Sequence, residues 1–363
     1  MNTKLLALFL VALTALGGMN LYQNIQERFF PVAVSQGPVH EHAVDQDEHE
    51  IRFVDTRRAD DEVLIDQRFK VRPGDRLEID VPHTDVVIET GASDEAHVLL
   101  TFRARDRERA REVYEAMQYR AEQHDGTVRV EAESPRGGWS WKRMGGLDLT
   151  LRVRIPSPFE LDVSTSHGDL RLPDLQGPVE ARTSHGDLIA GTLTGPLVHL
   201  ATSHGDLEAK GLRGDQVVLN TSHGDLMAEA VQAGTFTART SHGDIDLGEV
   251  MAGTFDVHTS HADVSIGRAE GEAEITNSHG DIGVYLVKAT AARLQTSHGD
   301  ILLRIPERLG AELDLEGGRV HLDVEQFTGE RKDDRAYGQL NGGGPLLRAR
   351  TTHGSISVEA TRR

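Results

Sequence analysis

The stretch TSHGD at residues 165–169 decides the fold, because the same five residues return unchanged later in the chain. Unchanged copies begin at Thr183, Thr202, Thr221, Thr240 and Thr296, and altered copies (TSHAD, NSHGD and TTHGS) begin at Thr259, Asn277 and Thr351. The first eight copies follow one another every 18 or 19 residues. A fixed short period indicates that one small unit is stacked, with each unit burying its apolar face against the next.

Alternating apolar residues flank each copy and predict strands. Leu170 and Leu172 follow the first copy at alternate positions, and Phe236 and Ala238 precede the copy at Thr240 in the same way. A period of two is typical of β-strands, whereas helical repeats need units of about 33 residues or more. The chain is therefore expected to be all-β: a β-helix-like solenoid of 18–19-residue coils, each with two short strands. The motif glycine is expected to occupy a turn position with positive φ.

The composition limits the partners that the chain can have. It has 363 residues and a formal net charge of −19 at pH 7. Such a charge repels nucleic acid and anionic membrane surfaces, so neither is expected as a partner. Aromatic residues make up only 5% of the chain and glycines number 37, which fits thin stacked coils better than a thick globular core. The lack of cysteine excludes disulfides and thiolate metal sites.

The first 22 residues have the pattern of an export signal. Lys4 precedes an apolar run over residues 5–16, and Gly17 supplies a small residue of the kind a signal peptidase prefers. The segment is expected to be either a cleaved signal peptide or a signal anchor, so the protein should be exported and periplasmic or associated with the cell envelope. Contact with the membrane is expected only through this segment. Residues 23–50 are expected to form a polar linker.

Residues 51–160 are expected to form an N-terminal β-rich cap with one helix. The stripe of Val113, Tyr114 and Met117 predicts that helix between Asp106 and His124. The only tryptophans, Trp139 and Trp141, lie in the loop RGGWSWKRMGG and either contact a partner or fold back on the cap. Residues 161–363 are expected to form the solenoid with a C-terminal cap, because the period is lost after Ile305 and returns only near the end.

Several segments resemble a known bacterial family. FKVRPGDRLEIDV begins at Phe69, LTLRVRIPSPFELDVSTSHGDL at Leu149 and NGGGPLLRARTTHGSISVE at Asn341. Together with the repeated turn ending in Gly-Asp and an aliphatic residue, these segments resemble the bacterial putative-adhesin family of β-strand-repeat domains over most of residues 65–360. The resemblance implies a repetitive β fold in an exported or envelope-associated protein and supplies no catalytic residues. Histidine at the third motif position is an elaboration of this chain.

The motif itself allows three chemical interpretations. A Ser-His-Asp triad is disfavoured, because residues one and two apart in an extended turn cannot align, and triads are assembled from distant segments. Stacked coils lie about 4.8 Å apart, so the motif places histidines and aspartates in two adjacent columns. These columns could share Zn, Ni or Cu ions. The candidate metal ligands are His167, His185, His204, His223, His242, His261, His279, His298, Asp169, Asp187, Asp206, Asp225, Asp244, Asp263, Asp281 and Asp300.

The third interpretation is structural, and it is favoured over the metal site. In this case the motif side chains bond backbone groups coil after coil, and Asp accepts amide hydrogens at the corner. The sequence therefore predicts a non-enzymatic exported scaffold or adhesion module without a cofactor, whose partner is an unidentified protein or glycan of the cell envelope. The alternative is a protein that binds or buffers divalent transition metals.

Overall fold

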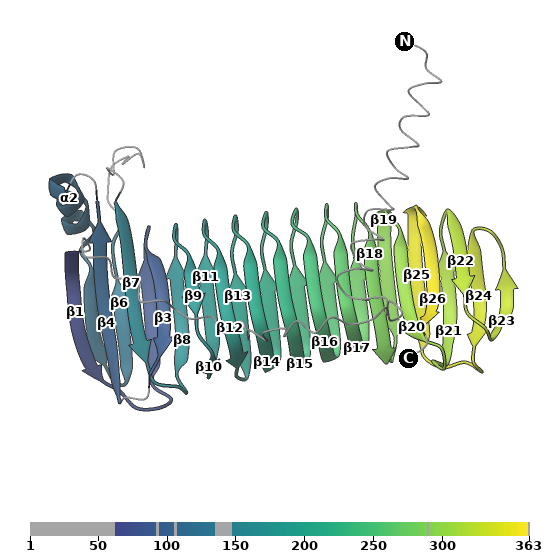
Figure 1. Cartoon of the computed structure of the whole chain (residues 1–363), viewed down its shortest axis with the longest axis horizontal. Helices are drawn as coiled ribbons and strands as arrows, with labels where there is room; N and C mark the ends of the chain where they lie inside the picture. Colours follow the sequence, from purple (N-terminus) through teal and green to yellow (C-terminus); the bar gives the residue numbers. More distant parts are fainter. Residues whose placement is uncertain (1–61, 92–93, 105–106, 135–146, 289, 362–363) are drawn as a thin grey trace, which may run out of the picture. The chain divides into compact units, whose positions relative to one another are not determined.

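The computed structural model describes residues 62–91, 94–104, 107–134, 147–288 and 290–361. These residues contain 26 strands and one helix, and they belong to a single compact unit, Asp55–Arg363. Strand follows strand in one continuous stack (Figure 1). The prediction of a β-solenoid is therefore confirmed. In the described part, no helix is long and apolar enough to cross a membrane.

Each coil contributes one strand to each of two parallel ladders, joined by the motif turn. The leading ladder holds the strands that precede a motif: β8 (Glu160–Thr165), β11 (Val179–Thr183), β13 (Leu197–Ala201) and β19 (Ala292–His298). The trailing ladder holds those that follow: β9 (Leu170–Leu172), β12 (Leu188–Thr194), β18 (Ile282–Lys288) and β20 (Ile301–Pro306). Four longer strands run through both: β14 (Leu207–Asn220), β15 (Leu226–Arg239), β16 (Ile245–His258) and β17 (Val264–Thr276). A short strand, β10 (Leu175–Gln176), pairs with β12.

The apolar core lies between the two ladders and repeats from coil to coil. In the coil of β15, Leu226, Val231 and Phe236 are buried, and the next coil stacks Phe255 on Phe236 in the same register. Large side chains of this kind each stabilise the fold by about 1.5–3 kcal/mol when fully buried. Because a shift of one residue would turn every apolar side chain outward, this alternation fixes the register of the stack.

The motif glycines are required by close packing. A Cβ built on Gly205 or Gly224 would overlap the carbonyl oxygen of the motif glycine one coil earlier. Among the motif glycines, only Gly280 and Gly299 have positive φ, at 136° and 156°. The expectation of positive φ is therefore wrong for the other motif glycines, whose turns need room for the neighbouring backbone instead.

At the N-terminal end, an early coil is inserted between later ones. The strands β2 (Arg76–Val81) and β3 (Asp85–Thr90) pair with β8 and β9 on one side. On the other side they pair with β6 (Thr127–Glu131) and β7 (Asp148–Ile155). Three antiparallel strands extend the two ladders beyond that point: β1 (Glu62–Lys70), β4 (Glu95–Arg103) and β5 (Arg120–His124).

The helix is shorter than the sequence pattern predicts. It is α2 (Arg107–Met117), and Val113 and Met117 on its inner face are buried. Gln118 has a φ of +49°, which helical residues cannot adopt, so the helix ends there. Ala121, expected on the helix, belongs to β5, where the chain pairs with β6. The expected extension to His124 is therefore wrong.

The C-terminal end repeats the inserted-coil arrangement. The strands β25 (Leu346–His353) and β26 (Ser355–Thr361) pair with β19 and β20. On their other side lie β21 (Ala311–Glu316) and β22 (Arg319–Asp323), which come earlier in the chain. The antiparallel strands β24 (Arg335–Leu340) and β23 (Phe327–Arg331) complete this end of the leading ladder. The last coil in the sequence, β25 and β26, thus lies between two coils that precede it in the chain.

Candidate functional site: the histidine ladder

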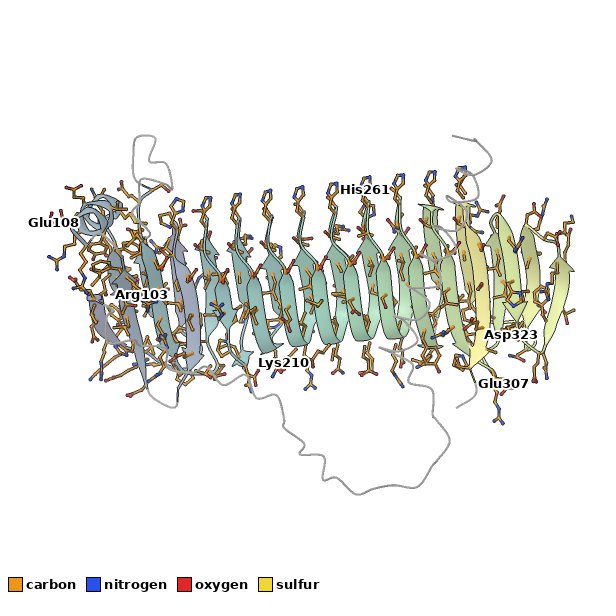
Figure 2. All side chains as sticks on the ribbon, turned by 45° about the horizontal axis from the view of Figure 1, so that its top comes forward. Arg103, Glu108, Lys210, His261, Glu307 and Asp323 are labelled. Atoms are coloured by element: carbon orange, nitrogen blue, oxygen red, sulfur yellow. The ribbon has the colours of Figure 1, made fainter. Side chains whose placement is uncertain are left out.

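The motif histidines form one row of stacked rings along the turns. From His167 to His353, neighbouring ring centroids lie 4.4–5.1 Å apart, and the ring planes are within 5° of parallel. From His204 to His298, each backbone N–H donates to the motif serine of the coil before it; His223 N–H, for example, donates to Ser203 O at 3.1 Å. The side chains from His167 to His353 are exposed and project outward in a row (Figure 2).

The ladder contains two histidines beyond the eight predicted as ligands. His353 stacks on His298 at 4.5 Å, and His83 stacks on His167 at 4.3 Å with the rings inclined by 29°. His83 lies in the stretch VPHTD, which keeps only the histidine and aspartate of the motif. The spacing of histidine and aspartate alone could have revealed it. We call these ten side chains the histidine ladder: His83, His167, His185, His204, His223, His242, His261, His279, His298 and His353.

The motif aspartates form a second row with a defined backbone role. In each coil, an Asp Oδ1 atom accepts a hydrogen bond from the backbone N–H at the same place in the next coil, at 2.7–3.1 Å. The acceptors are Asp85, Asp169, Asp187, Asp206, Asp225, Asp244, Asp263, Asp281 and Asp300. These are the amide bonds expected if the motif is structural.

The first motif residue forms a third row, which is buried. The Thr202 hydroxyl donates to Gly186 O at 3.0 Å, and Thr296 donates to Gly280 O at 3.1 Å. At Asn277, the side-chain amide donates to Ala262 O in the same way. Thr259 is the exception in this row, because its buried Oγ1 has no hydrogen-bond partner. Its coil carries Ala262 in place of the motif glycine.

Burial and crowding shift the pKa of several groups in these rows. Burial, reinforced by the neighbouring carboxylates of Asp263 and Asp300, raises the pKa of Asp281 to about 6. Burial also raises the pKa of Asp85 and of Asp263. At the N-terminal end of the ladder, burial and then the charge of the next histidine lower the pKa of His83 and His167.

The family model of the Toastrack domain, DUF4097, matches residues 74–359. The chain belongs to the Toastrack family. The predicted resemblance to a bacterial β-repeat family of unknown function is thereby confirmed. The match spans the whole histidine ladder and all but the last two residues of the two inserted coils.

The solved structures that match this Toastrack chain share little sequence with it. A "putative adhesin" from Parabacteroides merdae is 12% identical, with 83% of this chain and 96% of that chain covered and a TM-score of 0.37. A "putative lipid binding protein" from Parabacteroides distasonis is 14% identical, with 68% and 94% covered and a TM-score of 0.36. No curated protein matches the chain. Similarities this weak assign no function.

The geometry of the TSHGD turn bears on both the triad and the metal site considered from the sequence. The Oδ1 atom of Asp169 accepts the Asp187 N–H, and its Oδ2 atom lies 3.2 Å from Arg171 Nη2, so its hydrogen bonds lead away from a Ser-His-Asp relay. Within the described ranges, no three His, Cys, Asp or Glu side chains are placed to hold one metal ion together. The shared His/Asp metal site stays a prediction. Trp139, Trp141 and the N-terminal 61 residues lie outside the described residues.

Proposed function

We propose that the chain is a non-enzymatic, exported interaction module of the cell envelope. The observation that carries this proposal is the display of functional side chains in continuous exposed rows along the stack. An enzyme concentrates its groups at one point, whereas this chain repeats the same exposed turn from coil to coil. Repeat proteins use surfaces of this kind for extended binding.

The exposed surface indicates which contacts the partner would make. Among the described residues, the exposed large apolar side chains are Val63, Met251 and Tyr337, which lie on β1, β16 and β24. Scattered apolar residues do not form a docking patch. The strand faces are instead polar, and the net charge of −19 disfavours a polyanionic partner. A glycan or envelope protein bound through hydrogen bonds and ion pairs fits this surface.

Export is tested by changing the apolar N-terminal run. A Leu10→Arg variant places a charge in this run and is expected to hold the chain in the cytoplasm, whereas the matched Leu10→Val variant is expected to be exported. Fractionation and N-terminal sequencing of the native product measure both. Export of the Leu10→Arg chain, or a cytosolic wild-type chain beginning at Met1, would overturn the proposed localisation.

The interaction role is tested with photo-cross-linkers on the two ladder faces of β15. Gln232 and Arg239 are exposed on the trailing and leading ladders, respectively. A face that binds an envelope component should give one reproducible cross-linked species, while a probe at Tyr337 on β24, near the C-terminal end of the stack, serves as the control. Identical cross-linking at all three positions, or none at either ladder face in intact cells, would contradict a specific interaction surface.

A further inference from the structure

We propose that the histidine ladder binds divalent transition-metal ions between adjacent pairs of imidazoles, with the aspartate row acting as a counter-charge instead of supplying the ligands. The metal ions would bind at the turn edge, whereas the partner contacts are tested on the strand faces, so the two proposals are tested on different residues. It also changes the ligand set predicted from sequence, by adding His83 and His353 and assigning the carboxylates another task.

The ligand chemistry favours metals that accept nitrogen. A neutral imidazole is a common ligand of Zn, Ni and Cu and a poor one for Mg or Ca. Nine of the ten ladder side chains, from His167 to His353, are exposed, so an ion reaches them without opening the fold. One oxygen of each ladder carboxylate already accepts the amide of the next coil; Asp206 Oδ1 accepts that of Asp225 at 2.9 Å. Within the described ranges, no ladder carboxylate joins two histidines in a group placed to hold one ion.

The spacing limits each ion to two ladder ligands. Two imidazole nitrogens bound to one tetrahedral zinc at 2.0–2.1 Å are about 3.4 Å apart. Neighbouring ladder rings are stacked with centroids at 4.4–5.1 Å, so adjacent nitrogens need to approach by roughly 1–1.7 Å. The stacked rings are parallel, so their nitrogen lone pairs point the same way, and each ring must also turn by roughly 55° for a pair to converge on one ion. The exposed side chains can make this turn without opening the fold. Rings two coils apart are too far away for such a movement, and solvent would fill the remaining coordination positions.

The charges on the turn edge favour cations in a row. Ten imidazoles used in pairs hold at most five ions. Neighbouring divalent ions roughly 10 Å apart would repel by roughly 2 kcal/mol in water. The nine ladder carboxylates run beside the same turns, and the chain carries a net charge of −19, so both oppose that repulsion.

Two variants with the same number of substitutions separate paired from single-imidazole binding. The alternating variant changes His167, His204, His242, His279 and His353 to Asn and leaves no adjacent pair. The block variant changes His242, His261, His279, His298 and His353 to Asn and leaves five consecutive histidines. Both variants keep His40, His42 and His49, which precede the ladder in the sequence, so any metal binding by these three contributes equally to both titrations.

The measurement is calorimetric titration of the untagged, metal-free full-length chain with Zn²⁺, with circular dichroism to verify the fold of each variant. The block variant is expected to retain two paired sites. The alternating variant is expected to lose all of them, with a loss of roughly 100-fold or more in apparent affinity. Equal binding by the two variants, or no binding by the wild-type chain, would overturn the proposal.

A measurement on the wild-type chain covers the case in which a variant does not fold. Imidazole NMR signals should shift or broaden with Zn²⁺ for the ladder histidines and stay unchanged for His199 and His97, which lie within strands β13 and β4. Equal perturbation of ladder and strand histidines would show non-specific binding and reject the site. Neither result alters the export or cross-linking tests, so the two proposals fail separately.

Discussion

The Oδ1 atom of Asp206 lies 2.9 Å from the backbone nitrogen of Asp225 and accepts its N–H, linking one coil to the next at the motif turn. The same bond recurs from Asp85 to Ser355. Because the acceptor is charged, each bond is stronger than a neutral one. The repeated aspartate thus contributes to holding the coils in register, whether or not the turn binds a ligand.

We expect Asp206→Ala to lower the free energy of unfolding by about 1.5 kcal/mol, because the Asp225 amide loses a charged acceptor. Asp206→Asn keeps an acceptor oxygen and should lose less. The measurement is the shift in urea midpoint. Glu208→Ala, an exposed change on β14, is the control. If Asp206→Ala and the control have the same midpoint, the bond makes no net contribution.

A methyl group at Gly224 should break a hydrogen bond between its own coil and the coil before it. The added Cβ would overlap Gly205 O, which accepts the Thr221 hydroxyl at 3.2 Å. Displacing that oxygen leaves the buried hydroxyl without its acceptor, so Gly224→Ala is expected to cost about 1–3 kcal/mol. Chemical denaturation measures the cost. A midpoint equal to that of the wild-type chain would show that the turn backbone shifts without losing the hydrogen bond from Thr221 to Gly205.

One coil already carries alanine at the motif glycine position, and replacing that alanine with glycine should have the opposite effect on stability. Ala262 stands in a motif glycine position, and Thr259 Oγ1 in that coil is buried without a partner. Ala262→Gly should let Gly243 O return to the Thr259 hydroxyl. The gain of about 1 kcal/mol from the bond is opposed by the flexibility of glycine, which costs about 0.4–1 kcal/mol. A small rise in midpoint is expected, and a fall beyond about 1 kcal/mol would contradict the account.

The sequence predicts the repeating unit because local chemistry determines it. The alternation after each motif, as at Leu170 and Leu172, is sufficient to predict strands, and the motif aspartates predict amide bonds at the corner. The role of Gly224 could not be predicted in the same way. Its crowding comes from a backbone 19 residues away, so the demand for a small residue is visible only when the coils are stacked.

The order of the end coils and the full length of the histidine ladder depend on tertiary closure. Every coil presents similar faces, so the sequence does not show that β26 lies between β20 and β22. His83 escapes a motif search because its turn lacks the serine and glycine. The spacing of its histidine and aspartate makes it a candidate, and the insertion of β2 and β3 beside the first motif coil places it in the ladder.

The inserted C-terminal coil predicts which segment is lost when it is removed. The outer strands β21 and β22 meet the rest of the stack through β25 and β26. Deleting residues 345–363 should therefore expose residues 309–340 to proteolysis while the coils up to β20 stay protected. Limited proteolysis with mass spectrometry gives the cleavage map. Continued protection of residues 309–340 would show that the outer coil is held by other contacts.

Removing one whole coil should leave a folded chain, because β14 and β16 present matching faces to the coil between them. Deletion of Thr221–Arg239 joins Asn220 to Thr240 and brings equivalent positions together. Deletion of Thr221–Ala230 removes half a coil and serves as the control, since it breaks the alternation of the two ladders. Circular dichroism and proteolysis should show a β fold only for the first. Unfolding of both deletions would contradict independent stacking.

His199 provides a pH test outside the motif turns. It lies half-buried on β13, with Glu180 Oε1 3.4 Å from its Nδ1 and Asn220 Nδ2 3.3 Å from its Nε2. Arg182 forms a close ion pair with the same glutamate. Burial, followed by the charge of Arg182, lowers the pKa of His199 below 6.5.

This lowered pKa means that His199 stabilises the fold in its neutral form. The unfolded chain binds the proton more tightly, so the contribution is present above about pH 6.5 and is lost as pH falls through the folded pKa. We expect His199→Gln to lose less stability than the wild-type chain between pH 7.5 and pH 5, with His321→Gln on β22 as the matched control. Direct NMR titration decides the sign: a folded pKa above 6.5 would mean that Glu180 outweighs burial and Arg182, and the pH dependence would then reverse.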